Sequence, residues 1–334
     1  MTTYPDDLPT WTIVMPTYNR TEIFAQTLRH LAVQDYPHDK FEVLAVDNSA
    51  EPVEAMVQRV AAETGATLRY LRDDHRLPAV KRNTGWRQGS GELVLFMNDD
   101  AWARPDFLLQ HVAAHRRHAP QAVAIVGQVP QSSAMPPTPF LEWFRPFSYW
   151  ELTDGQRLTW MYCWSMNLSI PRRVLADHHI AFYEDWPEIG QEDLQLGYQL
   201  VQAGIPLYYC ASAIAEHYHP HTLASAAAVQ RYIGRGLHDL QRLVPEPGIL
   251  ERYGIFMWRQ PPDRIAKGLL KRAIFNRATI PVVTRYLDTR ARNNALTVHL
   301  YWKVLNYWTT TGYREAAPLA RERARQARIG VQGA

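Results

Sequence analysis

Apolar runs alternate with segments of helical spacing along the first half of the chain, and this alternation restricts the folds that it can adopt. Five runs have the length and composition of buried strands: WTIVMP (11–16), FEVLAVD (41–47), TLRYLR (67–72), ELVLFM (92–97) and AVAIVG (122–127). The stretches between them favour helices over residues 20–35, 51–64, 78–90 and 104–119. This pattern predicts an α/β fold with a mostly parallel sheet and helices on both faces.

Polar clusters close each of the first four strand candidates. They read PTYNR, DNS, DDHR and NDD in chain order. Ligands of open α/β sheets gather at the carboxyl ends of the strands. We therefore expect these four clusters to surround one crevice.

The rest of the chain changes character twice. Residues 130–160 are rich in Pro and aromatic side chains without a clear period, which is typical of a lid or a binding loop. A second α/β portion follows over residues 171–219. Beyond about 222 the sequence favours helices, and we expect its Pro residues to break them at 245, 247, 261, 262, 281 and 318.

Composition indicates a globular cytoplasmic protein. The two cysteines, Cys163 and Cys210, form neither a disulfide framework nor a metal-type spacing. The start lacks the character of a secretory signal, and no apolar run reaches the roughly 18 residues of a membrane span. Residues 251–334 carry 16 Lys and Arg against 5 Asp and Glu. This basic end favours peripheral contact with anionic lipid, although a solvated helical face explains it equally well.

Six short motifs follow one another in an order that resembles family 2 of the GT-A-fold glycosyltransferases. They are TIVMPTYNR, VDNS, KRNTGWRQGSGELVLFMNDD, MNLSIPRR, GQEDLQLGYQLVQAG and HYHP, and together they cover roughly residues 10–222. The resemblance implies a GT-A catalytic domain over 1–222, with nucleotide-sugar binding over 10–128 and the acceptor side over 129–222. A helical, basic region would follow over 223–334.

The resemblance implies a nucleoside diphosphate sugar as the donor. Tyr18 would stack on a pyrimidine base, and Asn48 stands where relatives often have a second acid. An amide also forms hydrogen bonds, so UDP is favoured and dTDP stays open. The expected donor-binding residues are Pro16, Thr17, Tyr18, Arg20, Asp47, Asn48, Arg82, Asn83, Asn98 and Asp99.

Structural alternatives exist for several of these donor residues. Asp47 could form only an Asx turn, and Asn19 could cap the helix that follows the first strand. Cations at a helix start suit a phosphate. For Lys81, however, an exposed basic helix face is the simpler interpretation.

Asp99 and Asp100 stand side by side after the fourth strand. Carboxylates at a strand end suit Mg²⁺ or Mn²⁺. By resemblance, Asp100 would bind this divalent metal together with His217 and His219, and Asp99 would bind the ribose. Asn98 replaces a third acid of many relatives, which weakens the metal site without excluding it. Solvated surface histidines are the alternative.

Glu192 and Asp193 begin an expected helix, where acids also serve as simple caps. By resemblance, Asp193 would be the general base, the single displacement would invert the anomeric configuration, and Glu192 would orient the acceptor or Asp193. Trp164 and Asn167 are the expected acceptor-side residues, because flat aromatic faces pack against sugar rings.

These observations predict an inverting glycosyltransferase whose acceptor is a saccharide, a lipid-linked saccharide or a small molecule, with no nucleic acid partner. A catalytically silent nucleotide-sugar or glycan-binding module is the first alternative. A sugar nucleotidyltransferase is less favoured because PTYNRTEIF contains no Gly to meet a triphosphate. The missing G-x-G-x-x-G after the first strand argues against a Rossmann oxidoreductase.

Overall fold

The computed structural model describes residues 7–144, 149–186, 189–255, 262–292 and 294–332, and the chain divides into two compact units. The first unit consists of residues 1–136, 147–185 and 192–219. The second consists of residues 137–146, 186–191 and 220–334. The division near residue 220 lies close to the boundary that the sequence predicted. The second unit also takes two short segments that the sequence interpretation had placed in the α/β domain.

The described part of the first unit contains a nine-stranded sheet in the order β3-β2-β1-β4-β8-β6-β9-β5, with β7 paired to β9. The strands are β1 (Trp11–Thr17), β2 (Phe41–Asp47), β3 (Leu68–Arg72), β4 (Leu93–Met97), β5 (Ala101–Ala103), β6 (Ala124–Gln128), β7 (Arg157–Leu158), β8 (Asn167–Pro171) and β9 (Leu207–His217). All five strands that the apolar runs predicted are present, within two residues at each end.

The sheet has a parallel half and a mixed half. Strands β3, β2, β1 and β4 run parallel to one another, as the alternation of strands and helices predicted. Beyond β4 the short strand β8 enters antiparallel between β4 and β6. The apolar pattern did not identify β8 or β5 as strands, because β8 contains the polar residues Asn167 and Ser169 and β5 has only three residues.

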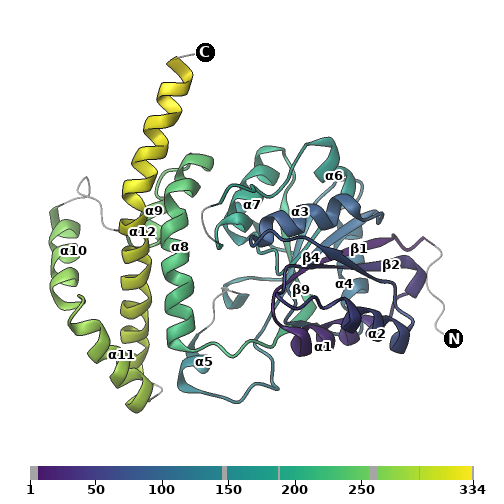
Figure 1. Ribbon diagram of the computed structural model, residues 1–334, viewed down its shortest axis with the longest axis horizontal. Helices are drawn as coiled ribbons and strands as arrows, with labels where there is room; N and C mark the ends of the chain where they lie inside the picture. Colours follow the sequence, from purple (N-terminus) through teal and green to yellow (C-terminus); the bar gives the residue numbers. More distant parts are fainter. Residues whose placement is uncertain (1–6, 145–148, 187–188, 256–261, 293, 333–334) are drawn as a thin grey trace. The chain divides into compact units, whose positions relative to one another are not determined.

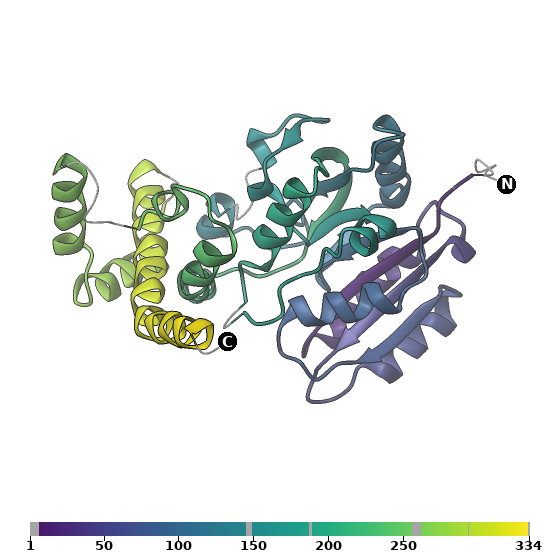
Figure 2. The same ribbon diagram turned by 90° about the horizontal axis from the view of Figure 1, so that it is seen from above.

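Helices cover both faces of this sheet (Figures 1 and 2). They are α1 (Thr21–Ala32), α2 (Glu54–Thr64), α3 (Pro78–Gln88), α4 (Phe107–Arg117), α6 (Arg172–Asp177) and α7 (Glu192–Gln202), with 3₁₀ turns at His38–Lys40, Tyr149–Glu151 and Trp160–Tyr162. Buried side chains of α1, α2 and α4 share one core with β1, β2 and β4. Burial of each large apolar side chain stabilises the fold by about 1.5–3 kcal/mol.

Parallel register brings the carboxyl ends of β1, β2 and β4 to the same edge. Thr17 at the end of β1 pairs with Asp47 at the end of β2. On the other side, Val14 pairs with Phe96, so the residues that follow β4 lie beside the end of β1. The polar clusters after β1, β2 and β4 therefore gather at one edge.

The second unit is helical in its described part: α5 (Pro139–Trp143), α8 (Leu223–Leu243), α9 (Ile249–Arg252), α10 (Pro262–Ile274), α11 (Thr279–Arg290) and α12 (Ala295–Gln332). Helices α8 and α12 pack side by side. A Cβ atom on Gly234 or Gly312 would lie 2.0 Å from a backbone oxygen of the opposite helix, so both glycines permit this close approach. No helix within the described ranges is long and apolar enough to span a membrane.

Pro318 does not end a helix, contrary to the sequence-based expectation, because α12 continues through it. Proline removes one backbone donor from a helix. Burial of Tyr301, Val304 and Leu305 against the other helices anchors α12 before that position. Packing elsewhere on α12 therefore overrides this local signal.

Candidate active site

Arg20 joins the two acids that follow β4. Its Nη1 atom donates to Oδ1 of Asp99 at 3.2 Å and also to Oδ2 of Asp100. Thr17 at the end of β1 donates its hydroxyl to Oδ2 of Asp99 at 2.8 Å. In helix α1, Thr27 donates to the backbone oxygen of Asp99 at 2.7 Å, which fixes the turn after β4. Three elements thus position the acid pair.

Two histidines from the end of β9 and the loop after it reach Asp100. Nε2 of His217 lies 3.3 Å from Oδ1 of Asp100, and Nδ1 of His219 lies 2.9 Å from Oδ2. The antiparallel pairing of Ala101 with His217 brings β9 beside the acid pair. The structure therefore gathers the three metal ligands that the sequence predicted.

The electrostatics of the two acids differ. Burial and the neighbouring charge of Asp100 raise the pKa of Asp99 to about 6, although Arg20 and Thr17 act in the opposite direction. Burial would also raise the pKa of Asp100. His217, His219 and Arg20 nevertheless lower it well below its usual range. Asp100 is therefore the more readily ionised of the two carboxylates.

This donor set fits a divalent cation. Asp100 supplies carboxylate oxygens, and the two histidines supply imidazole nitrogens. The Oδ1 atom of Asp100 is buried and faces Nε2 of His217 at 3.3 Å. Carboxylate oxygens suit Mn²⁺ or Mg²⁺, whereas imidazole nitrogens suit transition metals.

Lys81 is buried at the end of β1 and β2. Only 2% of its surface is exposed, so the exposed helix face expected for it is wrong. Its Nζ donates to the backbone oxygen of Thr17 at 2.9 Å and to Oδ1 of Asn48 at 2.7 Å. Because an ammonium group only donates hydrogen bonds, the Asn48 amide must turn its oxygen toward Lys81.

Asp47 holds the loop after β2. Its carboxylate accepts hydrogen bonds from the backbone N–H groups of Ser49 at 2.7 Å and Val53 at 3.1 Å, and from the hydroxyl of Tyr70 at 3.2 Å. The side chain is fully buried. This is the Asx turn that the sequence left open, and it makes Asp47 a positioning residue for Asn48.

Tyr18 lies on the surface beside this loop, with 57% of its area exposed. Its neighbour Asn19 has a positive φ of 51°. Asn19 does not cap helix α1, because this helix has no side-chain cap. Asn19 instead donates its backbone N–H to the Ser49 hydroxyl at 2.7 Å and accepts from the Ala50 N–H at 3.1 Å. These bonds tie the turn after β1, with Pro16 at its start, to the loop after β2.

Arg82 links the acid pair to the start of α7. Its guanidinium donates to Oδ1 of Asn98 at 3.2 Å and to Oε1 of Glu192 at 3.5 Å. It also lies 3.9 Å from Oδ1 of Asp193. Asn98 directly precedes the two acids, so this one buried side chain connects a predicted donor-binding residue with the two predicted catalytic residues of α7.

Ser165 fixes the carboxylate of Asp193. Its backbone N–H donates to Oδ2 at 3.0 Å, and its hydroxyl donates to Oδ1 at 2.5 Å. The Asp193 side chain keeps 27% of its area exposed, whereas that of Glu192 keeps 7%. Sequence reasoning missed Ser165, although it lies in the CWSMN segment that supplied Trp164 and Asn167.

The side chain of Asn83 forms hydrogen bonds with the segment that follows α6 and does not line an open pocket. Its amide donates to the backbone oxygen of Phe182 and to Oε1 of Glu184, both at 2.7 Å, and accepts from the Phe182 N–H at 3.1 Å. Asn83 is fully buried. A donor phosphate therefore cannot reach its side chain in this conformation.

Asn167 lies in the core, which argues against the acceptor contact expected for it. Its exposed area is 0%, and its amide donates to the backbone oxygens of Gln128 at 3.2 Å and Ala213 at 2.9 Å. Its Oδ1 accepts from Nε2 of His111 at 2.8 Å. Trp164 is partly exposed, and its ring meets that of Tyr149 edge-on.

Comparison with known proteins agrees with this arrangement. The sequence model described as glycosyl transferase family 2 matches residues 12–178, half of the chain. The chain belongs to glycosyl transferase family 2. The matched range contains Tyr18, Asn48 and Asp100 at strand ends and Arg82 on α3, and it stops before Asp193.

A curated relative is the validoxylamine A glucosyltransferase of Streptomyces hygroscopicus subsp. jinggangensis. It is 28% identical over 229 residues, which cover 60% of this chain and 53% of that protein. The chain thus spans about half the length of the first curated relatives that it matches.

Two solved structures share the fold. Residues 1–349 of TarS from Staphylococcus aureus align with a TM-score of 0.51 at 16% identity, covering 92% of this chain and 91% of that chain. The mannosyltransferase PcManGT from Pyrobaculum calidifontis, in complex with GDP-Man and Mn²⁺, aligns with a TM-score of 0.59 at 18% identity. That alignment covers 92% of this chain and 87% of PcManGT. The expected GT-A fold with C-terminal helices is confirmed.

Proposed function

We propose that this family 2 member is an inverting, metal-dependent glycosyltransferase that moves a sugar from a nucleoside diphosphate to an acceptor hydroxyl. The observation that carries the proposal is the contact of Arg82 with Asn98 on one side and with Glu192 and Asp193 on the other. The positive charge of Arg82 would thus lie between the residue that precedes the acid pair and the proposed base, where a diphosphate and a reacting sugar would meet.

In this proposal, Asn48 selects the nucleobase of the sugar donor. Lys81 holds the amide oxygen, so the amide NH₂ group is left to donate a hydrogen bond. Uracil and thymine both carry ring carbonyl oxygens that accept such a bond, and the exposed ring of Tyr18 would stack on either base. We favour UDP, and dTDP remains the alternative donor nucleotide. A TarS structure contains UDP-GlcNAc, which agrees with a uridine donor.

Asp100, His217 and His219 would hold the divalent metal. When bound there, Mn²⁺ or Mg²⁺ would neutralise charge on the diphosphate leaving group. The neighbouring Asp99 would accept hydrogen bonds from the ribose. Arg20, which contacts both acids, would add a positive charge beside the diphosphate.

Asp193 is the proposed general base. Its carboxylate would take the proton of the acceptor hydroxyl as the acceptor oxygen bonds to the anomeric carbon. The bond from that carbon to the diphosphate oxygen breaks in the same displacement, so the configuration inverts. Ser165 keeps the carboxylate in one orientation. Glu192, which contacts Arg82, would orient the acceptor side, with Trp164 as a flat surface for a sugar ring.

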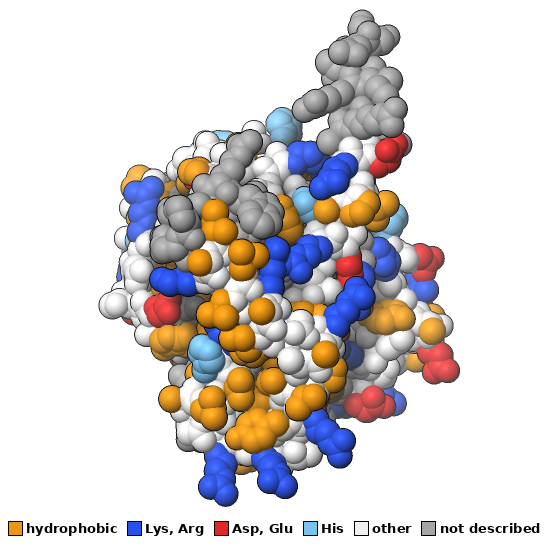
Figure 3. Space-filling model, turned by 90° about the vertical axis from the view of Figure 1, so that its left-hand side faces the viewer, with side chains coloured by type: hydrophobic (Ala, Val, Ile, Leu, Met, Phe, Trp, Pro, Cys, Tyr) orange, Lys and Arg blue, Asp and Glu red, His pale blue; other side chains and the backbone are white. Residues whose placement is uncertain are grey.

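The acceptor would lie at a membrane surface or in a glycoconjugate of the cytoplasm. Helices α10, α11 and α12 expose Leu270, Val282 and Trp302. Apolar side chains lie among Lys and Arg on this face (Figure 3). Apolar and basic residues together suit the interface of an anionic membrane. We therefore propose peripheral membrane contact through the second unit.

Donor hydrolysis tests the proposal without a known acceptor. The protein is first screened by thermal shift against UDP-, dTDP- and GDP-sugars, with and without Mn²⁺. NMR then follows the anomer released from an α-linked donor before it equilibrates. We expect metal-dependent stabilisation and release of the β-anomer. Release of the α-anomer would contradict inversion, and donor binding without hydrolysis or transfer would favour the silent module.

A further inference from the structure

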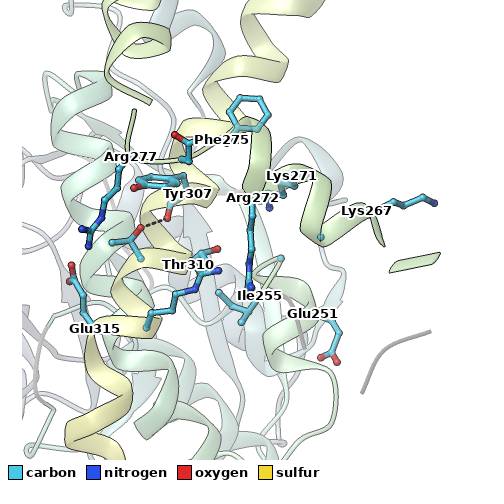
Figure 4. A pocket seen from close by; sticks show the side chains of 15 residues that line it. Glu251, Ile255, Lys267, Lys271, Arg272, Phe275, Arg277, Tyr307, Thr310 and Glu315 are labelled. Carbon is cyan, nitrogen blue, oxygen red and sulfur yellow. Dashed lines mark hydrogen bonds between the residues drawn. The ribbon is translucent and has the colours of Figure 1, made fainter. Parts of the chain in front are cut away.

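Helices α9, α10 and α12 of the second unit enclose a cavity of about 660 Å³. Its walls also include the turn between α10 and α11. Figure 4 shows Arg272, Tyr307 and Thr310 around this cavity, with Lys271 beside Arg272. No part of the mechanism proposed above uses this cavity.

Positive charge dominates the lining. Among the described residues of the lining, five are cations, Lys267, Lys271, Arg272, Arg277 and Arg314, and two are carboxylates, Glu251 and Glu315. Glu315 already accepts hydrogen bonds from Nε of Arg231 at 2.8 Å and from Nε of Arg235 at 3.2 Å, both on α8. Cations therefore outnumber acids in the described part of the lining.

Lys271 is the most constrained of these cations. It is half-buried, and its Nζ donates to Oδ1 of Asn306, a neutral group. No salt bridge to Lys271 is formed within the described ranges. Burial lowers its pKa to about 8, and the positive charges of Lys303 and Arg314 act in the same direction. Burial and the charge of Arg272 also lower the pKa of Arg314, against a smaller effect of Tyr307.

Crowded cations that lower one another's pKa raise the energy of the folded protein unless an anion lies among them. The described lining has an excess of cations, and a bound anion would also relieve the crowding of Lys271 and Arg314. From this geometry we propose that the cavity is a binding site for a phosphate or diphosphate ester.

The residue types specify this class of ligand. Guanidinium groups match the several oxygens of a phosphate, and an ammonium group adds a point charge. Phosphate esters carry about −1.5 to −2 charges at neutral pH, more than a single carboxylate. The volume exceeds that of a phosphate alone, and Phe275 and Tyr307 add apolar ring faces to the lining. An ester with an attached group of about the size of a sugar ring would fit.

Calorimetry on the full chain in EDTA tests this site, with inorganic pyrophosphate and glucose 1-phosphate as soluble probes. We expect saturable binding that weakens roughly ten- to hundredfold in Lys271→Gln, the range for a lost hydrogen bond to a charged group. The exposed Arg314→Gln should weaken binding in the same direction even if Lys271→Gln folds poorly. Arg285→Gln, an exposed cation of α11 outside the lining, is the matched control for charge and should bind as the wild type.

A second comparison separates this cavity from the candidate active site. Arg20→Gln should leave probe binding unchanged. Loss of probe binding in Arg20→Gln with full binding in the two cavity variants would overturn the proposal. Probe binding that weakens in Arg285→Gln as much as in the cavity variants would also overturn it, as would the absence of saturable binding of any probe.

Vesicles identify the source of the phosphate. Phosphatidylcholine vesicles with a minor share of phosphatidic acid are compared with neutral vesicles in a sedimentation assay. Binding that depends on Lys271 and on phosphatidic acid assigns the site to a lipid phosphate. Binding only of the soluble probes assigns it to a soluble phosphate ester. Vesicle binding that is the same in wild type and Lys271→Gln, without soluble binding, would contradict the site.

Discussion

Ser165 holds the carboxylate of Asp193 by two hydrogen bonds, one from its backbone N–H at 3.0 Å and one from its hydroxyl. We expect Ser165→Ala to lower kcat roughly tenfold or more while the KM for the donor stays near the wild-type value, because a hydrogen bond to a charged group is lost on the base alone. Steady-state kinetics of donor turnover measure this separation.

Ser165→Thr retains the hydroxyl and is the control for this prediction. It should restore most of the turnover that Ser165→Ala loses. If donor KM rises while kcat is unchanged, Ser165 acts on donor binding and does not position the base.

Asp100→Ala should remove the effect of Mn²⁺ on donor binding, because Asp100 is the acid that both histidines contact. Calorimetric titration of UDP with and without Mn²⁺ measures the effect. Asp39→Asn, an exposed acid on the 3₁₀ turn before β2, is a control that should keep the wild-type response. A metal titration of Asp100→Ala that matches the wild type would refute the metal assignment.

Lys81 predicts a pH dependence of stability. Burial lowers its pKa to about 8, with smaller effects of Asp99, Asp47, Arg82 and Asp73. The unfolded chain therefore binds more protons than the folded chain between pH 8 and roughly 10.5, the ordinary value for lysine, and stability from this group rises with pH across that window.

Thermal unfolding at pH 7.5 and pH 10 tests the contribution of Lys81. Other groups also titrate in this range, so the comparison is between wild type and Lys81→Gln. The wild type should gain stability relative to the variant as the pH rises. Parallel curves for the two proteins would show that Lys81 keeps an ordinary pKa in the folded state.

Asn167→Ala should destabilise the first unit by about 1–3 kcal/mol, the cost of leaving a buried hydrogen-bond partner unsatisfied. Its amide bonds to Gln128 and Ala213 would be lost, and His111 would lose its acceptor. Denaturant unfolding measures the change in the free energy of unfolding. Turnover per folded molecule should stay unchanged, whereas a selective rise in KM for an acceptor would restore the sequence-based interpretation.

Much of the parallel half of the sheet was predictable from the sequence. Strands β1, β2 and β4 are apolar runs buried on both faces, and the helices between the strands have regular spacing. Strand β8 was not predictable in this way, because Asn167 and Ser169 are polar residues inside the core. Their burial depends on His111, which lies far away in the sequence and reaches both side chains.

The sequence predicted which residue types gather at the strand ends of the candidate site. It did not predict which role each of these residues has. The motifs singled out three polar side chains as binding residues: Asp47, Asn83 and Asn167. Their hydrogen bonds go to the protein itself. Sequence spacing cannot reveal this, because it does not show which polar groups find partners within the fold. Lys81 is the opposite case, because the sequence predicted an exposed side chain. Its burial is explained by its hydrogen-bond partners at the ends of β1 and β2.

Donor turnover by Asp193→Asn, measured beside donor affinity in the same preparation, tests the central claim most directly. The account predicts that transfer, or donor hydrolysis where the acceptor is unknown, falls by about 10²–10⁴, the contribution of general-base catalysis. Donor affinity should stay near the wild-type value, and Asp185→Asn, an exposed acid of the same unit, should be fully active. Turnover by Asp193→Asn at the wild-type rate would contradict the account and place the base elsewhere.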